Sequence, residues 1–259
     1  MSAVICETLQ GGVARVAINL PRKRNAIGPE VRDELIAIIP KLLDDQNVYA
    51  IIFGSEGGHF CSGGDVASMS DIDVQVGRSR MQANHKLVKI LAEAEKPIIS
   101  AVEGFALGAG AGICLLSDTV VVARSSKIGF PYCRIGLTPD YGILYTLPRR
   151  VGWGKARQIL LRGRTLGGEE AVREGVADEL TADGASEVRA IEIAEKMARV
   201  APNAFALAKR HLMIGVHSLE AALELETLSQ SLAFVGDELG EGRRAFLAKR
   251  QADFRKGKK

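Results

Sequence analysis

Two segments rich in glycine and alanine have the composition needed to bind a negatively charged oxygen through the backbone. They cover residues 57–65 and residues 104–112. Small side chains let backbone N–H groups approach a ligand closely. The second segment runs directly into an apolar helical pattern, and the first turn of a helix adds free donors and the positive end of a dipole. Each segment alone is more typical of a tight turn or close helix packing, but together they predict a site for one oxyanion.

The elements expected to position these segments alternate between strands and helices. Residues 13–20 alternate apolar with smaller or polar side chains, which is typical of a strand with one buried face. Residues 29–45 have apolar side chains at helical spacing, after a glycine and a proline suited to a helix start. Three short apolar runs predict buried strands and two further stretches predict helices: 49–53, 98–102 and 119–123, then 80–95 and 108–117. This βαβ order predicts an α/β fold with a largely parallel sheet, and each glycine-rich segment follows one of its strands.

The second half of the chain is mostly helical in its pattern. The helical stretches are 153–162, 168–175, 185–201, 203–216, 218–236 and 238–254. We therefore divide the chain into a core over residues 1–199 and a C-terminal helical region over residues 200–259. In that region one helix carries an apolar stripe that needs a partner, within the chain or in another subunit: Leu225, Leu228, Leu232 and Val235. Trp153, the single tryptophan, is expected in the core.

Composition and charge exclude several classes of protein. The chain has 259 residues, of which 47% are apolar and 25% charged, and its formal net charge is +3. This is typical of a soluble globular protein and far below the basic excess of a nucleic-acid-binding protein. Residues 1–10 do not resemble a secretory signal, and no long uncharged apolar stretch predicts a membrane span. The four cysteines lack metal-ligand spacing, so we expect reduced thiols, no metal site and a cytoplasmic protein.

Seven sequence strings, taken together, carry a family resemblance. Two are the glycine-rich segments with their flanks, HFCSGGDV at 59–66 and KPIISAVEGFALGAGAG at 96–112. The others are PRKRNAIGPEV, RIGLTPDYG, LPRRVG, GRTLGGEEAVREGVADEL and AFLAKRQADF. Over nearly the whole chain they resemble the crotonase (enoyl-CoA hydratase/isomerase) superfamily. The resemblance implies a crotonase-like ββα spiral core with a C-terminal helical oligomerisation region, assembled as a homotrimer or a dimer of trimers. It also implies an acyl-CoA thioester substrate, with coenzyme A as part of that substrate and no separate cofactor.

The resemblance assigns roles to individual residues. The backbone N–H groups of Gly64 and Ala109 match the two donors that hold the thioester carbonyl oxygen, and such donors favour a transition state in which that oxygen becomes negative. The positions that match the loops lining the CoA moiety and the acyl group are Arg24, Ala26, Ser62, Asp65, Val66, Gly110 and Tyr132. Phe246 and Lys249 match a helix that reaches the CoA nucleotide, often of a neighbouring subunit. Arg24 and Lys249 would meet phosphates as cations.

The candidate acids depart from the pattern of the family's hydratases. Those enzymes use two glutamates, which would fall at positions 112 and 132, where this chain has Gly112 and Tyr132. Neither residue can act as a carboxylate base. Asp140 lies in a string that resembles the family's isomerases, in which an acid at this position moves a proton between carbons of the acyl chain. One carboxylate suffices to shift a double bond from the 3,4 to the 2,3 position, so Asp140 is predicted as the acid and base of an enoyl-CoA isomerase.

Several alternatives stay open at this point. The string around Asp140 also resembles relatives that rearrange ring epoxides of aryl-acyl-CoA and a dehalogenase branch with a nucleophilic Asp, and hydratase-like activity is another candidate. Asp140 could instead cap a helix starting near Tyr141, since Asp is a favoured N-cap. An RNA-binding homologue without catalysis is the alternative from another class, although a charge of +3 is small for that role.

Overall fold

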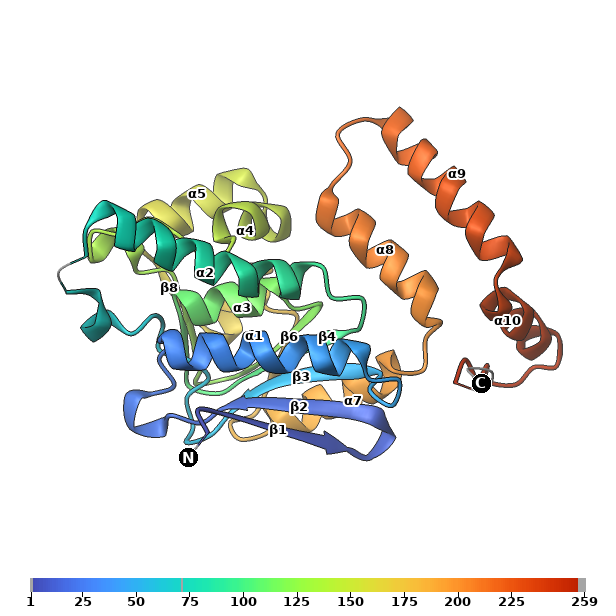
Figure 1. Ribbon diagram of the computed structural model, residues 1–259, viewed down its shortest axis with the longest axis horizontal. Coiled ribbons are helices and arrows are strands. Elements are labelled where there is room, and N and C mark those ends of the chain that lie inside the picture. Colours follow the sequence, from blue (N-terminus) through green and yellow to red (C-terminus); the bar gives the residue numbers. More distant parts are fainter. Residues whose placement is uncertain (1, 71, 256–259) are drawn as a thin grey trace.

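The computed structural model describes residues 2–70 and 72–255, and over these residues a six-stranded sheet forms the centre of the molecule. Its strand order is β1-β2-β3-β4-β6-β9, in which β1 runs antiparallel to β2 and all other neighbours are parallel. The strands are β1 (Val4–Leu9), β2 (Val13–Ile18), β3 (Ala50–Ser55), β4 (Ile98–Val102), β6 (Thr119–Ala123) and β9 (Glu179–Thr181). The predicted α/β class is therefore confirmed (Figure 1).

Helices cover both faces of this sheet (Figure 1). One face packs against α1 (Pro29–Asp44), α2 (Val74–Ala92) and α3 (Ala109–Leu116), and the other packs against α7 (Ser186–Met197). Ile51 and Phe53 of β3 belong to the larger apolar core together with Leu35 of α1. Ile52, between them, joins Ala190 of α7 in a second cluster. Because alternate residues point to opposite faces and both faces are covered, these strands read as continuous apolar runs.

A second, three-stranded sheet lies beside the first and was not predicted from the sequence. It contains β5 (Phe105–Leu107), β7 (Lys127–Gly129) and β8 (Thr165–Gly167) in the order β5-β7-β8. Strands of three residues carry too short a pattern to be distinguished from loops. The sheet matters for the site because β5 lies within the second glycine-rich segment and leads directly into α3.

The second half is helical, as predicted, with one additional helix. Its helices after β7 are α4 (Ile143–Val151), α5 (Trp153–Leu161), α6 (Gly168–Arg173), α7, α8 (Pro202–Ile214), α9 (Leu219–Val235) and α10 (Asp237–Leu247). Helix α4 is absent from the predicted helical stretches, although the cap alternative for Asp140 assumed a helix starting near Tyr141. It contains Pro148, a residue that usually marks a helix end. Among residues 2–70 and 72–255, no helix combines the length and apolar character needed to cross a bilayer.

The expectation that Trp153 packs in the core is wrong. Trp153 is 70% exposed. Trp153 is the first residue of α5, and it follows Gly152, which has φ of 80°. The buried residues of this helix are Ala156, Ile159 and Leu160. Trp153 lies three residues before Ala156 on the same side of the helix, so its exposure reflects its place at the helix start.

A buried charge attaches the C-terminal helices to the sheet. Lys209 of α8 is only 8% exposed, and its Nζ donates to Asp118 Oδ2 at 2.7 Å and to the carbonyl of Lys96 at 3.1 Å. Asp118 Oδ2 also accepts from the amide of Ile98, the first residue of β4. Burial lowers the pKa of Lys209, and the negative charge of Asp118 opposes this effect. The charge is thus paired and hydrogen-bonded, as a buried charge must be.

The remaining C-terminal helices bury little of their apolar surface. Helix α9 has no buried residue within the chain, and Leu228, Leu232 and Val235 of the predicted apolar stripe are 56%, 65% and 84% exposed. Figure 1 shows α9 and α10 extending away from the sheet on the far side of α8. Helix α7 ends at Met197 and α8 begins at Pro202, so the proposed division at residue 199 falls in the connection between them.

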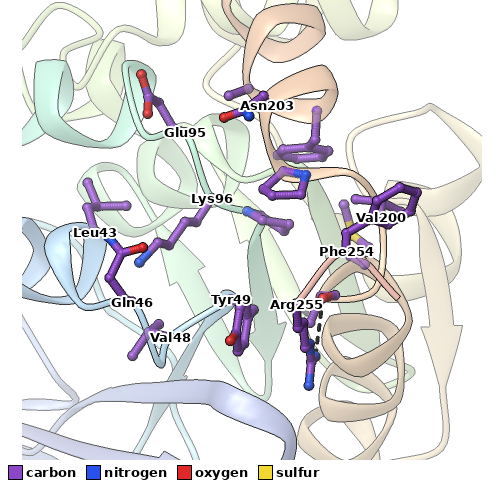
Figure 2. A pocket seen from close by; sticks show the side chains of 16 residues that line it. Leu43, Gln46, Val48, Tyr49, Glu95, Lys96, Val200, Asn203, Phe254 and Arg255 are labelled. Carbon is purple, nitrogen blue, oxygen red and sulfur yellow. Dashed lines mark hydrogen bonds between the residues drawn. The ribbon is translucent and has the colours of Figure 1, made fainter. Parts of the chain in front are cut away.

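A cavity of about 150 Å³ lies where the start of α8 and the C-terminal end of the described chain meet the core (Figure 2). Arg255 stacks over the ring of Tyr49 at 4.2 Å and donates to the carbonyl of Ala198 at 3.1 Å. Lys96 Nζ donates to the carbonyl of Leu42 at 2.8 Å. None of the residues predicted for the site lines this cavity, so it belongs to the attachment of the C-terminal region.

Candidate active site

The two glycine-rich segments lie side by side. The amide of Cys61 donates to the carbonyl of Phe105 at 2.7 Å, and the amide of Leu107 donates to the carbonyl of Cys61 at 2.9 Å. These bonds form a parallel bridge between Cys61 and Ala106, so the first segment runs as an extra extended strand along β5. This pairing is the structural reason that residues separated by more than forty positions meet.

Close backbone approach continues at the ends of both segments. A Cβ placed on Gly63 would be 3.3 Å from the carbonyl oxygen of Leu107, and one placed on Gly108 would be 3.8 Å from Cα of Gly63. Both glycines also have positive φ, at 111° and 51° respectively. L-amino acids with side chains rarely adopt such angles, so glycine is required here by conformation as well as by space.

The predicted oxyanion donors lie immediately after these glycines. Ala109 is the first residue of α3, where a backbone N–H has no intrahelical acceptor. Gly64 forms an isolated parallel bridge with Ile27, in which the amide of Ile27 donates to Gly63 and the amide of Asp65 donates to Ile27. In the described part of the chain, neither the Gly64 amide nor the Ala109 amide donates to another backbone carbonyl. The structure thus brings two free amides to neighbouring turns.

The segment containing Arg24 and Ala26 lies along the first glycine-rich segment. The amide of Ser62 donates to the carbonyl of Arg24 at 3.0 Å. Lys23 and Asp65 form an ion pair at 3.5 Å. Of the residues predicted to line the CoA moiety, Arg24, Ala26, Ser62 and Asp65 are therefore brought together. Val66, which follows Asp65, is 61% exposed and begins a short 3-10 turn, Val66–Met69.

Asn25 holds this arrangement and was missed by sequence reasoning. It is fully buried and has φ of 57°, a left-handed conformation that Asn tolerates better than most residues. Its Oδ1 accepts from the amide of Leu20, and its Nδ2 donates to the carbonyls of Glu56 and His59. An Asn inside a turn such as PRKRNAIG is the available signal, since Asn side chains commonly bond to the backbone in turns.

Phe246 and Lys249 lie apart from the other predicted residues within one chain. Phe246 is on α10 and is 83% exposed, and Lys249 follows that helix with φ of 50°. Figure 1 shows α10 on the opposite side of the molecule from the segment between β3 and α2, which contains Gly64. A role for Phe246 and Lys249 at the CoA nucleotide therefore stays a prediction, and it requires a second subunit.

Asp140 lies next to Tyr132 and close to the second glycine-rich segment. The Tyr132 hydroxyl donates to Asp140 Oδ1 at 2.6 Å. The same hydroxyl oxygen is 3.7 Å from the point where a Cβ on Gly108 would lie, one residue before Ala109. The alternative role of Asp140 as a helix cap does not hold, because α4 begins at Ile143 with Gly142 as its N-cap and no side-chain cap.

Burial dominates the electrostatics of Asp140. It raises the pKa of the Asp140 carboxyl above its ordinary value of 3.8, while the hydrogen bond from Tyr132 and the charges of Arg80 and His85 lower it. Arg80 and His85 belong to α2, and sequence reasoning did not assign them to the site. No local signal links them to Asp140, because they come from a helix more than fifty residues earlier.

The comparisons with known proteins agree with this geometry. The sequence model of the enoyl-CoA hydratase/isomerase family matches residues 8–257. The chain belongs to this family. It is 30% identical over 246 residues to the short-chain-enoyl-CoA hydratase of Clostridium acetobutylicum, with 94% of each chain covered. It is also 30% identical over 262 residues to the 1,2-epoxyphenylacetyl-CoA isomerase of Escherichia coli K12, with 98% of this chain and 99% of the relative covered. A solved enoyl-CoA hydratase/isomerase of Cupriavidus metallidurans superposes with a TM-score of 0.91 at 31% identity, covering 98% and 97% of the two chains.

Membership in the enoyl-CoA hydratase/isomerase family confirms the predicted crotonase fold and makes the chain an acyl-CoA enzyme. The preference for the isomerase branch is not decided by the relatives, because most of those compared carry hydratase names. The residues of the site are therefore the basis for choosing between reactions.

Position 112 has no room for a side chain. A Cβ placed on Gly112 would lie 2.4 Å from Cβ of Tyr141 and 3.3 Å from its carbonyl oxygen. Tyr141 is 2% exposed and has φ of 50°. Its side chain and backbone fill the space that a side chain at position 112 would need, so this site has neither a carboxylate at 112 nor room for one.

Proposed function

We propose that this protein moves the double bond of a 3-enoyl-CoA to give the 2-enoyl-CoA. The observation that carries the proposal is the carboxylate of Asp140, held by Tyr132 at 2.6 Å beside the turn that contains Gly108 and Ala109. Double-bond migration needs one group that removes and returns a proton, and one carboxylate can do both.

The reaction can be written with the residues of this chain alone. Asp140 takes a proton from C2, and the electron pair moves toward the thioester oxygen as a dienolate forms. The amides of Gly64 and Ala109 donate to that oxygen, and one donor of this kind is typically worth about 3 kcal/mol of transition-state stabilisation. Asp140 then returns the proton to C4 and is regenerated as the carboxylate. The overall change is the position of the double bond, and the proposed chemistry uses no group other than the acyl-CoA and these residues.

The raised pKa of Asp140 suits both halves of this cycle. A carboxylate with a higher pKa is a stronger base toward the C2 proton. Its burial is the main cause of that shift. The hydrogen bond from Tyr132 and the charges of Arg80 and His85 oppose this shift, because they favour the ionised form that begins the cycle as a base.

Rearrangement of a ring epoxide on an aryl-acyl-CoA is the second candidate. The specific observation in its favour is the full-length similarity to the 1,2-epoxyphenylacetyl-CoA isomerase of Escherichia coli. Two-glutamate hydration is less well supported, since Gly112 and Tyr132 occupy both glutamate positions and Tyr141 fills the space at the first.

The deciding experiment offers purified protein a 3-enoyl-CoA, a 2-enoyl-CoA with water as co-substrate, and an aryl-CoA epoxide. We expect turnover of the 3-enoyl-CoA and its loss by about 10²- to 10⁴-fold in Asp140→Asn, with CoA affinity unchanged. Asp44→Asn, at the exposed end of α1, is the matched control and should keep full activity. Full isomerisation by Asp140→Asn, or turnover of the epoxide alone, would refute the proposed reaction.

We also propose that the protein assembles as a homotrimer or a dimer of trimers through its C-terminal helices. The exposed apolar stripe of α9 supports a contact with another subunit. No element of the same chain covers Leu228 or Leu232 in the described structure. In such an assembly Phe246 and Lys249 of one subunit would reach the CoA nucleotide bound by another, with Lys249 facing phosphate.

A further inference from the structure

We propose that Tyr132 is a positioning residue for Asp140: its hydroxyl fixes Oδ1 and so leaves Oδ2 as the proton acceptor that faces the substrate. The inference rests on the proposed function, in which Asp140 is the acid and base. It changes the predicted role of Tyr132 from a residue that lines the substrate pocket to one that acts through the carboxylate.

The hydrogen bond between the two residues has the geometry of a fixed contact. Its length of 2.6 Å is in the short range expected when a hydroxyl donates to a carboxylate. Tyr132 is 5% exposed, so water competes little for its hydroxyl. The bond is made by Asp140 Oδ1, and the carboxyl also interacts with the amide of its own residue.

The backbone also holds Tyr132 in place. It opens a 3-10 turn, Tyr132–Arg134, and its carbonyl accepts from the amides of Ile135 and Leu137, both at 3.0 Å. Hydrogen bonds thereby constrain the segment from 132 to 140 in two places. The backbone bonds fix its start, and the side-chain bond to Asp140 fixes its end. A tyrosine held in this way can orient its partner with little loss of rotamer freedom on binding.

The direction of the hydrogen bond follows from the protonation of the phenol. Burial raises the pKa of the Tyr132 hydroxyl, and the adjacent Asp140 charge raises it further, so the phenol stays protonated and donates. Arg80 and His85 from α2 also act on Asp140 through their charges, and Asp140 in turn raises the pKa of Tyr141 in the same segment. Tyr132 is the side chain that donates a hydrogen bond to this carboxyl.

The first test measures Asp140 without substrate. In the full-length protein, the pH titration of the Asp140 carboxyl carbon is followed by NMR, with the signal assigned by its absence in Asp140→Asn. Tyr132→Phe should raise the pKa of Asp140, because it removes a bond that stabilises the ionised form. Replacement of Tyr132 by 3-fluorotyrosine keeps the shape and makes the hydroxyl a stronger donor, so it should lower the pKa. A pKa of Asp140 that is the same in the wild type and both variants would overturn the proposal.

The second test measures catalysis. Tyr132→Phe should lower kcat for 3-enoyl-CoA roughly tenfold with KM unchanged, and the acidic limb of the pH profile should move to higher pH. A rise in KM at constant kcat would instead assign Tyr132 to substrate binding. If Tyr132→Phe does not fold, the fluorotyrosine protein decides by its titration. A wild type that does not turn over 3-enoyl-CoA would refute the proposed function, and the titration would still decide the role of Tyr132.

Discussion

Tyr141 occupies the space in front of Gly112, with only 2.4 Å between its Cβ and the point where a Cβ on Gly112 would lie. Both residues are buried, and Gly112 lies within α3, all of whose residues are buried. A larger residue at position 112 cannot be accommodated unless Tyr141 moves. The absence of a carboxylate at position 112 therefore goes together with the presence of Tyr141 beside it.

Gly112→Ala should destabilise the protein by about 1–3 kcal/mol because of overpacking against Tyr141. Thermal or denaturant unfolding measures the change. Gly154→Ala is the matched control: it lies in α5 with no heavy atom near the added methyl group, and it should be neutral or stabilising. Equal stability of the two variants would contradict the contact. Gly112→Glu alone should not produce hydratase activity, because Tyr141 obstructs the new side chain. Combining it with Tyr141→Gly removes this obstruction.

The packing of Gly110 against Cys61 predicts a loss of activity. A Cβ on Gly110 would be 2.7 Å from Cβ of Cys61 and 2.9 Å from its carbonyl oxygen. Gly110→Ala should therefore push the two glycine-rich segments apart and misalign the amides of Gly64 and Ala109. We expect kcat to fall by about 10²-fold, the size of effect seen when one such donor is lost. Steady-state kinetics with 3-enoyl-CoA measures this, and unchanged kcat would show that the two amides do not act together.

The raised pKa of Asp140 predicts that the ionised carboxyl costs stability. Because its pKa in the folded protein is above the ordinary value of 3.8, the cost is complete above the folded pKa and disappears below the unfolded one. Stability therefore falls as pH rises through this interval. Asp140→Asn should melt at a higher temperature than the wild type at pH 7, and the difference should vanish at pH 3. A less stable Asp140→Asn at pH 7 would contradict burial as the main cause of the shift.

The exposed stripe on α9 predicts the effect of charge on assembly. Leu228→Asp combined with Leu232→Asp should shift the protein from an oligomer to a monomer in light scattering, because two charges cannot be buried unpaired at an interface. Ser231→Asp adds a charge on the same helix at an exposed polar position and should assemble as the wild type does. A wild type that scatters as a monomer would show that the stripe has no partner.

The central fold could be predicted because its strands and helices repeat their patterns over five or more residues. The predicted strands at 98–102 and 119–123 coincide with β4 and β6. The missed strands have weak patterns: β1 is an edge strand with several exposed positions, and β5, β7, β8 and β9 have three residues each. Single-sequence periodicity cannot identify them, since their hydrogen bonds come from distant segments.

The site could be predicted in its backbone and only partly in its side chains. Gly63 and Gly108 have positive φ, which glycine adopts readily, so their residue type already indicates a backbone requirement. The bond between Tyr132 and Asp140 joins two irregular segments, where no periodicity indicates which way a side chain points. The approach of Arg80 and His85 depends on how α2 packs, which is a property of the tertiary structure.

The paired charges of Lys209 and Asp118 hold the start of β4, and the end of β4 leads into the second glycine-rich segment. Asp118 accepts from the amide of Ile98, where β4 begins, and β4 is five residues long and ends just before the segment at 104–112. Lys209 therefore connects α8 directly to the start of the strand that precedes the second glycine-rich segment. In the proposed assembly, neighbouring subunits that hold α8 in place would also fix the start of the strand that leads to residues 104–112.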